Sequence, residues 1–133
     1  ILGDITRIPS NDNSADAIIC IASFHHLSTY EKRIAGLKEM YRVLKNDGIL
    51  IAQVPLDEES EKTFEDSSIT DVYKRTKSFG QYDHVRVYGQ DYYNRLESVG
   101  FSTERIFIQK DLTLEEILRF ALPKQEKIPL MRK

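Results

Sequence analysis

The sequence is poor in the residues that build disulfide frameworks and membrane spans. Its 133 residues include no tryptophan and one cysteine, Cys20, in an apolar segment. A single cysteine excludes an internal disulfide framework and a zinc site built on several cysteines. No apolar run approaches the roughly 20 residues that a helix needs to cross a bilayer, and no cleavable signal is visible. We therefore expect a cytoplasmic protein without membrane attachment.

The charges are nearly balanced, which bears on the class of partner. The chain has 19 lysines and arginines, 21 aspartates and glutamates and a formal net charge of -2. Such a balance provides no overall basic surface for nucleic acid or anionic membranes, although it does not exclude a nucleic-acid substrate. With 41% hydrophobic residues, the chain has the size and composition of one globular domain.

Residues 14–55 encode a complete strand, helix and strand. The unbroken apolar run from Ala17 to Ser23 is typical of a parallel strand that is buried on both faces. From Thr29 to Leu44, apolar residues recur every three or four positions, which predicts an amphipathic helix. The turn-forming Asn46-Asp47-Gly48 then leads into a second buried strand from Ile49 to Val54. A crossover of this length predicts parallel strands with a right-handed connection.

The second half of the chain is predicted to leave the sheet and then return to it. Asp57 to Phe79 is rich in charged and hydroxyl residues, which favours a surface excursion or lid with one helix. The elements expected after it are a helix over Tyr92–Val99, a strand over Phe101–Ile108, a helix from Thr113 to Phe120 with a capping box to Glu116, and a final strand over Lys127–Arg132. Ile1 to Asp4 resembles the end of a further strand.

Two adjacent histidines, His25 and His26, follow the first predicted strand. Ligands collect beyond the carboxyl ends of parallel strands, so these rings are candidate catalytic groups. One could serve as a general base for a hydroxyl nucleophile, while a structural or substrate-positioning role is the alternative. Because the two are adjacent, we expect their rings to point in different directions. A metal site is not expected, since the third histidine, His84, has no acidic residue at a familiar ligand spacing.

Four segments together resemble the class I S-adenosylmethionine-dependent methyltransferases of the type 11 group. They are GDITRIP, NSADAIICIASFHHL, LKEMYRVLKNDGILIAQVP and DYYNRLESVGF. The family has a His-His-Leu at the exit of its fourth strand and ends the next helix with Arg-Val-Leu-Lys-Pro-Gly-Gly, where this chain has Asn46-Asp47-Gly48 in place of the last three residues. The resemblance implies an α/β, Rossmann-like three-layer sandwich of strand order 3-2-1-4-5-7-6 with an antiparallel last strand. Residues 1–133 would form the C-terminal part of a single domain without its N-terminal strands, and residues 57–79 would form the lid.

The resemblance also implies a cofactor, S-adenosylmethionine, and residues that bind it. Asp4 would accept a hydrogen bond from the adenine amino group, with Ile5 in apolar contact; a turn-forming role is the alternative for Asp4. Ser23, Phe24 and His25 would line the methionine side, and for Phe24 core packing is an equal alternative. The family's glycine-rich turn and its ribose-binding acidic residue have no counterpart here. This chain alone is therefore expected to bind the cofactor weakly or not at all, and to be inactive.

The methyl acceptor would lie where the excursion returns to the sheet. The candidates are Asp83, His84, Arg86 and Tyr88, although Arg86 could instead form a salt bridge. The expected acceptor is a small molecule. RNA is the second candidate, because SFHHLSTYEKRIAGLKEMYRVLK also resembles the tRNA wobble-uridine carboxymethyl methyltransferases. A noncatalytic interaction module remains a third alternative.

In the family's strand order, the strand Ala17 to Ser23 lies beside a first strand that this sequence does not contain. It would then form an open apolar edge, and such edges recruit other chains through their unpaired amides and carbonyls. We expect an upstream segment, or a second copy in a homodimer, to cover it.

Overall fold

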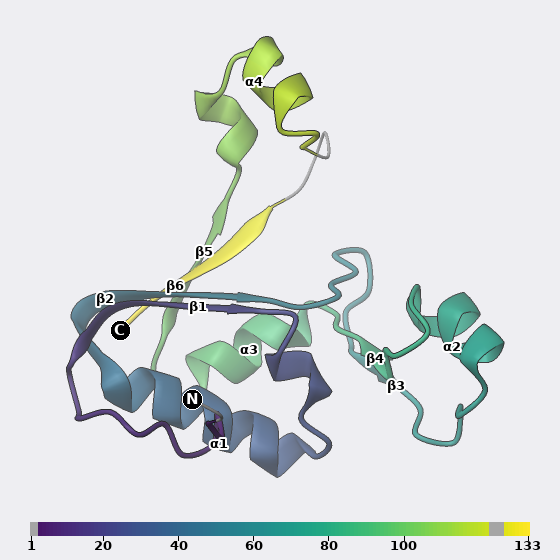
Figure 1. The fold of residues 1–133 in the computed structure, drawn as a ribbon, viewed down its shortest axis with the longest axis horizontal. Coiled ribbons are helices and arrows are strands. Elements are labelled where there is room, and N and C mark those ends of the chain that lie inside the picture. Colours follow the sequence, from purple (N-terminus) through teal and green to yellow (C-terminus); the bar gives the residue numbers. More distant parts are fainter. Residues whose placement is uncertain (1–2, 123–126) are drawn as a thin grey trace.

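The computed structural model describes residues 3–122 and 127–133 and contains a four-stranded sheet in the order β1-β2-β6-β5 (Figure 1). These strands are β1 (Ala15–Ile21), β2 (Leu44–Gln53), β5 (Ser102–Ile106) and β6 (Ile128–Arg132). β1 runs parallel to β2, whereas β6 runs antiparallel to both β2 and β5. The parallel pair and the antiparallel last strand are confirmed, and the order equals the 4-5-7-6 part of the expected sheet.

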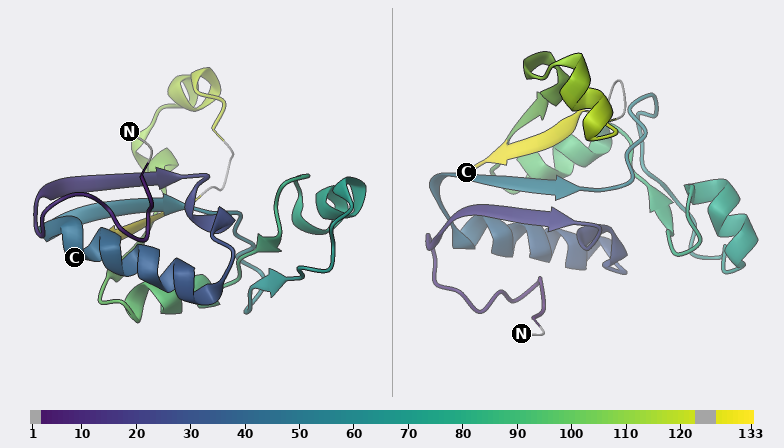
Figure 2. Two further views of the ribbon diagram at one scale, coloured as in Figure 1. Left: turned by 60° about the horizontal axis from the view of Figure 1, so that its bottom comes forward. Right: turned by 45° about the horizontal axis from the view of Figure 1, so that its top comes forward.

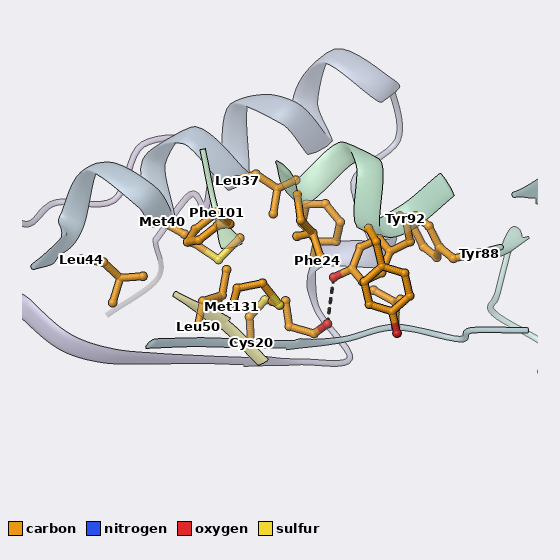
Figure 3. Packing of buried hydrophobic residues seen from close by; sticks show 14 residues of the cluster. Cys20, Phe24, Leu37, Met40, Leu44, Leu50, Tyr88, Tyr92, Phe101 and Met131 are labelled. Atoms are coloured by element: carbon orange, nitrogen blue, oxygen red, sulfur yellow. Dashed lines mark hydrogen bonds between the residues drawn. The ribbon is translucent and has the colours of Figure 1, made fainter. Parts of the chain in front are cut away.

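Two helices, α1 (Tyr30–Val43) and α3 (Asp91–Glu97), cover one face of this sheet (Figure 1). α1 begins where the Thr29 side chain accepts a hydrogen bond from the Lys32 amide at 3.2 Å, as expected for an N-cap. The core lies between these helices and the strands, and Figure 3 shows its side chains. Its fully enclosed members include Leu37, Met40, Leu50, Tyr92, Leu96 and Met131. Apolar burial on this face therefore holds the carboxyl ends of β1 and β2 in place.

The connection from α1 to β2 is tighter than predicted. β2 begins at Leu44, directly after the helix, so Asn46-Asp47-Gly48 lies within the strand and does not form a separate turn. Asp47 has a positive φ of 64°, and the pairing register with β1 shifts in this region. A Cβ on Gly48 would lie 2.8 Å from the Lys45 carbonyl oxygen, which explains why glycine is needed there.

The second face of β1 is bare among the described residues, and this differs from the prediction. Ile19 is 68% exposed and Ile21 is 55% exposed, so the strand is not buried on both faces. Figures 1 and 2 show α1 and α3 on the same side of the sheet. β1 is also an edge strand that pairs with β2. The expected open edge is thus confirmed for the part of the chain that the structure describes.

Residues 57–88, called the excursion below, form a lobe beside the sheet (Figure 1). It contains α2 (Val72–Phe79) and a short antiparallel pair, β3 (Phe64–Glu65) with β4 (Arg86–Val87). The Asp71 side chain caps α2 by accepting from the Lys74 amide at 2.9 Å. The predicted helix in this segment is confirmed, whereas the strand pair was not predicted.

The remaining elements are short. α4 (Leu114–Arg119) has the predicted capping box: the Thr113 amide donates to Glu116 Oε2 at 2.8 Å, and the Glu116 amide donates to Thr113 Oγ1 at 3.3 Å. The strand end expected at residues 1–4 falls partly outside the described residues, which begin at Gly3, and Asp4 forms an isolated bridge with Arg7. No helix in the described part of the chain is long and apolar enough to cross a membrane.

Candidate functional site

Three histidine rings meet beyond the carboxyl ends of β1 and β2. His25 and His26 belong to η1 (Phe24–His26), a short 3-10 turn directly after β1, and His84 comes from the excursion. The His25 centroid lies 4.1 Å from that of His26 and 4.9 Å from that of His84. The expectation that the adjacent rings point in different directions is therefore wrong. The tight turn brings them together.

His25 lines a hollow of about 230 Å³ at this edge of the sheet. We call it the histidine hollow; its lining residues are Ile21, Ala22, His25, Gln53, Val54, Pro55, Gln81 and His84. His25 is 4% exposed, whereas His26 is an exposed residue. Neither ring nitrogen of His25 has a hydrogen-bond partner within residues 3–122 and 127–133. The hydrogen-bonding capacity of this buried imidazole is therefore unused within those residues.

The surroundings of His25 keep its ring neutral. Burial, together with the positive charges of His26, His84 and Arg86, lowers the pKa of His25 from 6.5 to about 4, while Asp83 opposes the shift. Near neutral pH the ring therefore presents one N–H donor and one acceptor nitrogen.

Beside η1, a carboxylate lies between two buried arginines. Glu65 Oε1 is 2.8 Å from Arg86 Nη2, and Glu65 Oε2 is 2.9 Å from Arg33 Nη2. Arg86 is 1% exposed and Arg33 is 4% exposed. Burial opposes ionisation, but the hydrogen bonds and charges of Arg86 and Arg33 lower the pKa of Glu65, so the carboxylate is ionised at neutral pH.

The structure places two of the four predicted acceptor-binding residues near the histidine hollow and the other two away from it. His84 lines the histidine hollow, and its Nδ1 lies 3.4 Å from the Phe79 carbonyl oxygen. Asp83 is half-buried close to the rings. Arg86 is engaged in the buried ion pair with Glu65, and Tyr88 is fully buried in the core. Neither of these two residues lines the histidine hollow.

Most of the residues expected to bind the cofactor surround a second hollow, of about 360 Å³, which we call the edge hollow. It is lined by Gly3, Asp4, Ile5, Ile8, Pro9, Ile18, Ile19, Cys20, Ser23 and Met40. Asp4 Oδ1 accepts hydrogen bonds from the Thr6 amide at 2.8 Å and the Thr6 hydroxyl at 2.7 Å, so the turn-forming role is present. Phe24 is 1% exposed, and its ring packs against Tyr88 and Tyr92 in the core (Figure 3).

Sequence reasoning missed Glu65, Arg33 and Gln81. Arg33 lies on the apolar stripe of α1, four residues before Leu37, and is buried with it, a signal that the prediction did not use. Glu65 and Gln81 lie in a segment without periodicity, so no local signal distinguished them. A third hollow, of about 430 Å³, lies next to Gln53 and Val54 and is flanked by the ion pair of Glu58 and Lys127. It does not include the histidines. The described residues contain no group of three or more side chains able to hold a metal ion.

Comparisons with known proteins agree with this architecture. Residues 1–52 match the family model Methyltransf_11, described as a methyltransferase domain. The chain is 41% identical over 66 residues to the "Probable tRNA methyltransferase 9B" of Mus musculus, which is 50% of this chain and 15% of that protein. It is 42% identical over 45 residues, or 34% of this chain and 7% of the relative, to the tRNA (carboxymethyluridine(34)-5-O)-methyltransferase ALKBH8 of Macaca fascicularis. The matched segments are thus a small part of these relatives' length.

The fold is similar to that of a solved methyltransferase. The structure of human N-acetylserotonin methyltransferase in complex with SAM superposes with a TM-score of 0.58 at 17% sequence identity. The match covers 98% of this chain and 32% of that one. At this identity the likeness establishes the fold, which confirms the Rossmann-like α/β class.

Proposed function

We propose that the chain is a class I methyltransferase of the type 11 group and that it transfers a methyl group from S-adenosylmethionine to an oxygen of an RNA nucleotide held in the histidine hollow. The observation that carries this proposal is the neutral His25 ring at the carboxyl ends of two parallel strands, whose nitrogens have no hydrogen-bond partner among the described residues. RNA is supported by the names of the relatives, which are tRNA methyltransferases. The small-molecule acceptor expected from the sequence has no comparable support.

The edge hollow fits the cofactor in its chemistry. Ile5, Ile18 and Met40 offer an apolar wall for a flat ring, and the exposed Asp4 carboxylate retains an oxygen, Oδ2, that can accept from an amino group. The Ser23 hydroxyl, which donates to the Ile21 carbonyl oxygen at 3.0 Å, can still accept a hydrogen bond. When bound, S-adenosylmethionine would supply a methyl group on a positively charged sulfur, which is already a good leaving group.

His25 would then orient the acceptor oxygen. Its neutral ring can donate one hydrogen bond to a carboxylate or accept one from a hydroxyl, and its lowered pKa favours this orienting role over taking a proton from the nucleophile. The apolar walls at Ile21 and Val54 help to exclude water from the reacting atoms. The chain's part is therefore mainly alignment, as in-line displacement at an activated methyl group requires.

The test uses the complete parent protein, because this chain alone is expected to bind the cofactor weakly or not at all. That protein is incubated with methyl-labelled S-adenosylmethionine and, in separate reactions, total RNA or a protein-free extract of small molecules. We expect label in the RNA, and about 100-fold less of it with the His25→Ala variant. The Tyr92→Phe variant, altered in the core, serves as a control and should retain labelling. Label confined to small molecules would overturn the RNA acceptor, and the absence of label from both reactions would overturn methyl transfer itself.

A further inference from the structure

The Glu65 carboxylate joins the excursion to residues 24–27, which we call the histidine turn. Glu65 lies in β3 opposite Arg86 in β4, and the two residues are cross-strand partners in the pairing register. The same carboxylate also binds Arg33 on α1. One side chain thus links the excursion's strand pair to the helix that follows the histidines.

Both arginines also bind the main chain of the turn. Arg86 Nη1 donates a hydrogen bond to the His25 carbonyl oxygen, and Arg33 Nη1 donates to the Leu27 carbonyl oxygen at 3.1 Å. Each guanidinium therefore binds the Glu65 carboxylate and also donates a hydrogen bond to a backbone carbonyl beside the histidine pair. Planar, multiply hydrogen-bonded guanidinium groups fix geometry more strictly than single contacts do.

The charges make this arrangement dependent on Glu65. Arg33 and Arg86 are almost completely buried, so without the carboxylate two positive charges would face each other away from water. Unpaired buried charges are strongly unfavourable, and the arginines would have to move apart or reach solvent. In either case they would release the carbonyl groups of His25 and Leu27.

We propose that Glu65 is a positioning residue, which acts through Arg33 and Arg86 to hold the turn at residues 24–27 so that His25 faces the histidine hollow. The role in turnover rests on the proposed methyl transfer, whereas the role in holding the turn does not. The excursion that supplies Glu65 also supplies His84 and Gln81 to the hollow, so one carboxylate aligns both walls.

The experiment measures amide hydrogen exchange at pH 7 in the Glu65→Gln variant. The amides of His26 and Leu27 donate to the carbonyls of Ser23 and Phe24 at 3.1 and 3.2 Å, and they report directly on the turn. We expect both amides to exchange at least about tenfold faster than in the unaltered protein. In the variant the arginines no longer hold the turn, so the hydrogen bonds of these amides open more easily. Exchange at the unaltered rate would overturn the proposal.

The matched control is Asp91→Asn. Asp91 also forms a partly buried pair with an arginine, Arg95 at 2.6 Å, and it also fastens the excursion, by accepting from the Thr63 amide at 2.8 Å. Its side chain binds Thr63 and Arg95, neither of which belongs to the histidine turn. We expect this variant to leave the His26 and Leu27 exchange rates unchanged, and equal acceleration in both variants would show a general loosening and overturn the specific role. If Glu65→Gln does not fold, Glu65→Asp is measured, because its carboxylate keeps the charge but is too short to span both arginines.

Turnover of the complete parent protein provides the second readout. In Glu65→Gln we expect kcat to fall about tenfold or more while the Kd for S-adenosylmethionine stays within about twofold, since the edge hollow is not altered. If exchange is faster but kcat is unchanged, Glu65 holds the turn but this has no effect on turnover, and that part of the proposal is overturned. An inactive unaltered protein would overturn the proposed function, and the exchange rates would still decide whether Glu65 holds the turn.

Discussion

The rings of His25 and His84 lie nearly at right angles, with an interplanar angle of 76° and centroids 4.9 Å apart. His25 follows β1 directly, whereas His84 reaches the same place only because the excursion returns to the sheet. The hollow between them therefore depends on tertiary structure in two separate segments. Substitutions in either segment are therefore expected to alter the chemistry of the hollow.

The first prediction concerns which histidine acts on the acceptor. Replacing the enclosed His25 by alanine should lower kcat by about 100-fold, because the group that orients the oxygen is lost. His26→Ala should lower kcat by less than about tenfold, because this ring is exposed and contacts the reacting region through His25. Both variants are measured in the complete parent protein, where the Kd for S-adenosylmethionine, measured by calorimetry, should be nearly unchanged. Unchanged turnover in His26→Ala would remove His26 from the site, and a larger loss there than in His25→Ala would reverse the assignment.

The second prediction is a pH dependence of stability that arises from His25. Its folded-state pKa of about 4 lies below the unfolded value of 6.5, so between these values the unfolded chain binds a proton that the folded chain does not. Stability is therefore highest above pH 6.5 and is lost as the pH falls towards 4. Lowering the pH from 7 to 5 should reduce the free energy of unfolding by about 2 kcal/mol through this group alone.

Urea unfolding at the two pH values measures this loss. The His25→Asn variant has no titrating ring at this position, so its decrease between pH 7 and 5 should be smaller than that of the unaltered protein by about the same 2 kcal/mol. An equal decrease in both proteins would contradict the prediction and would mean that the His25 ring is solvated in the folded state.

The third prediction compares two buried tyrosines. The Tyr92 hydroxyl donates a hydrogen bond to the Ala52 carbonyl oxygen at 2.8 Å, shown as the dashed line in Figure 3. Tyr92→Phe should therefore lower the free energy of unfolding by about 1 to 2 kcal/mol, because the carbonyl is left unpaired in the core. Thermal or urea unfolding measures the change.

Tyr88→Phe is the matched control for that comparison. Tyr88 is equally buried, but its hydroxyl has no hydrogen-bond partner among the residues that the structure describes. Removing it should be neutral or slightly stabilising, because no hydrogen bond is lost. A loss in Tyr88→Phe as large as in Tyr92→Phe would indicate that ring packing, rather than the hydrogen bond, determines the result.

The features predicted correctly from the sequence were those with a local physical cause. The spacing of Ile34, Leu37 and Met40 identified α1, and the capping box of Thr113 and Glu116 identified α4. The parallel pairing followed because a helical connection between two adjacent strands allows little else. The resemblance to a known family then supplied the antiparallel last strand, which periodicity alone could not give.

The features that were missed depend on contacts between distant segments. Glu65 meets Arg33 only after the excursion folds back, and the excursion residues before Glu65 carry no periodic signal. The apolar run in β1 indicated burial on both faces, but burial depends on what covers a strand, and Ile19 and Ile21 are exposed among the described residues. The adjacent histidines were expected to diverge because they are consecutive in the sequence, whereas the 3-10 turn brings their ring centroids within 4.1 Å.

The last prediction concerns the bare edge and face of β1. Ile19 and Ile21 offer apolar side chains beside an unpaired strand edge, so the 133-residue chain should self-associate unless an upstream segment covers them. Burial of one isoleucine contributes about 1.5 to 3 kcal/mol, so Ile19→Lys should weaken association by at least tenfold in sedimentation or light scattering. Leu118→Lys is the control, since Leu118 on α4 is 71% exposed and far from this edge in the fold (Figure 1). If the chain stays monomeric at all concentrations, β1 is not the surface that recruits a partner. The same conclusion follows if Ile19→Lys and Leu118→Lys weaken association equally.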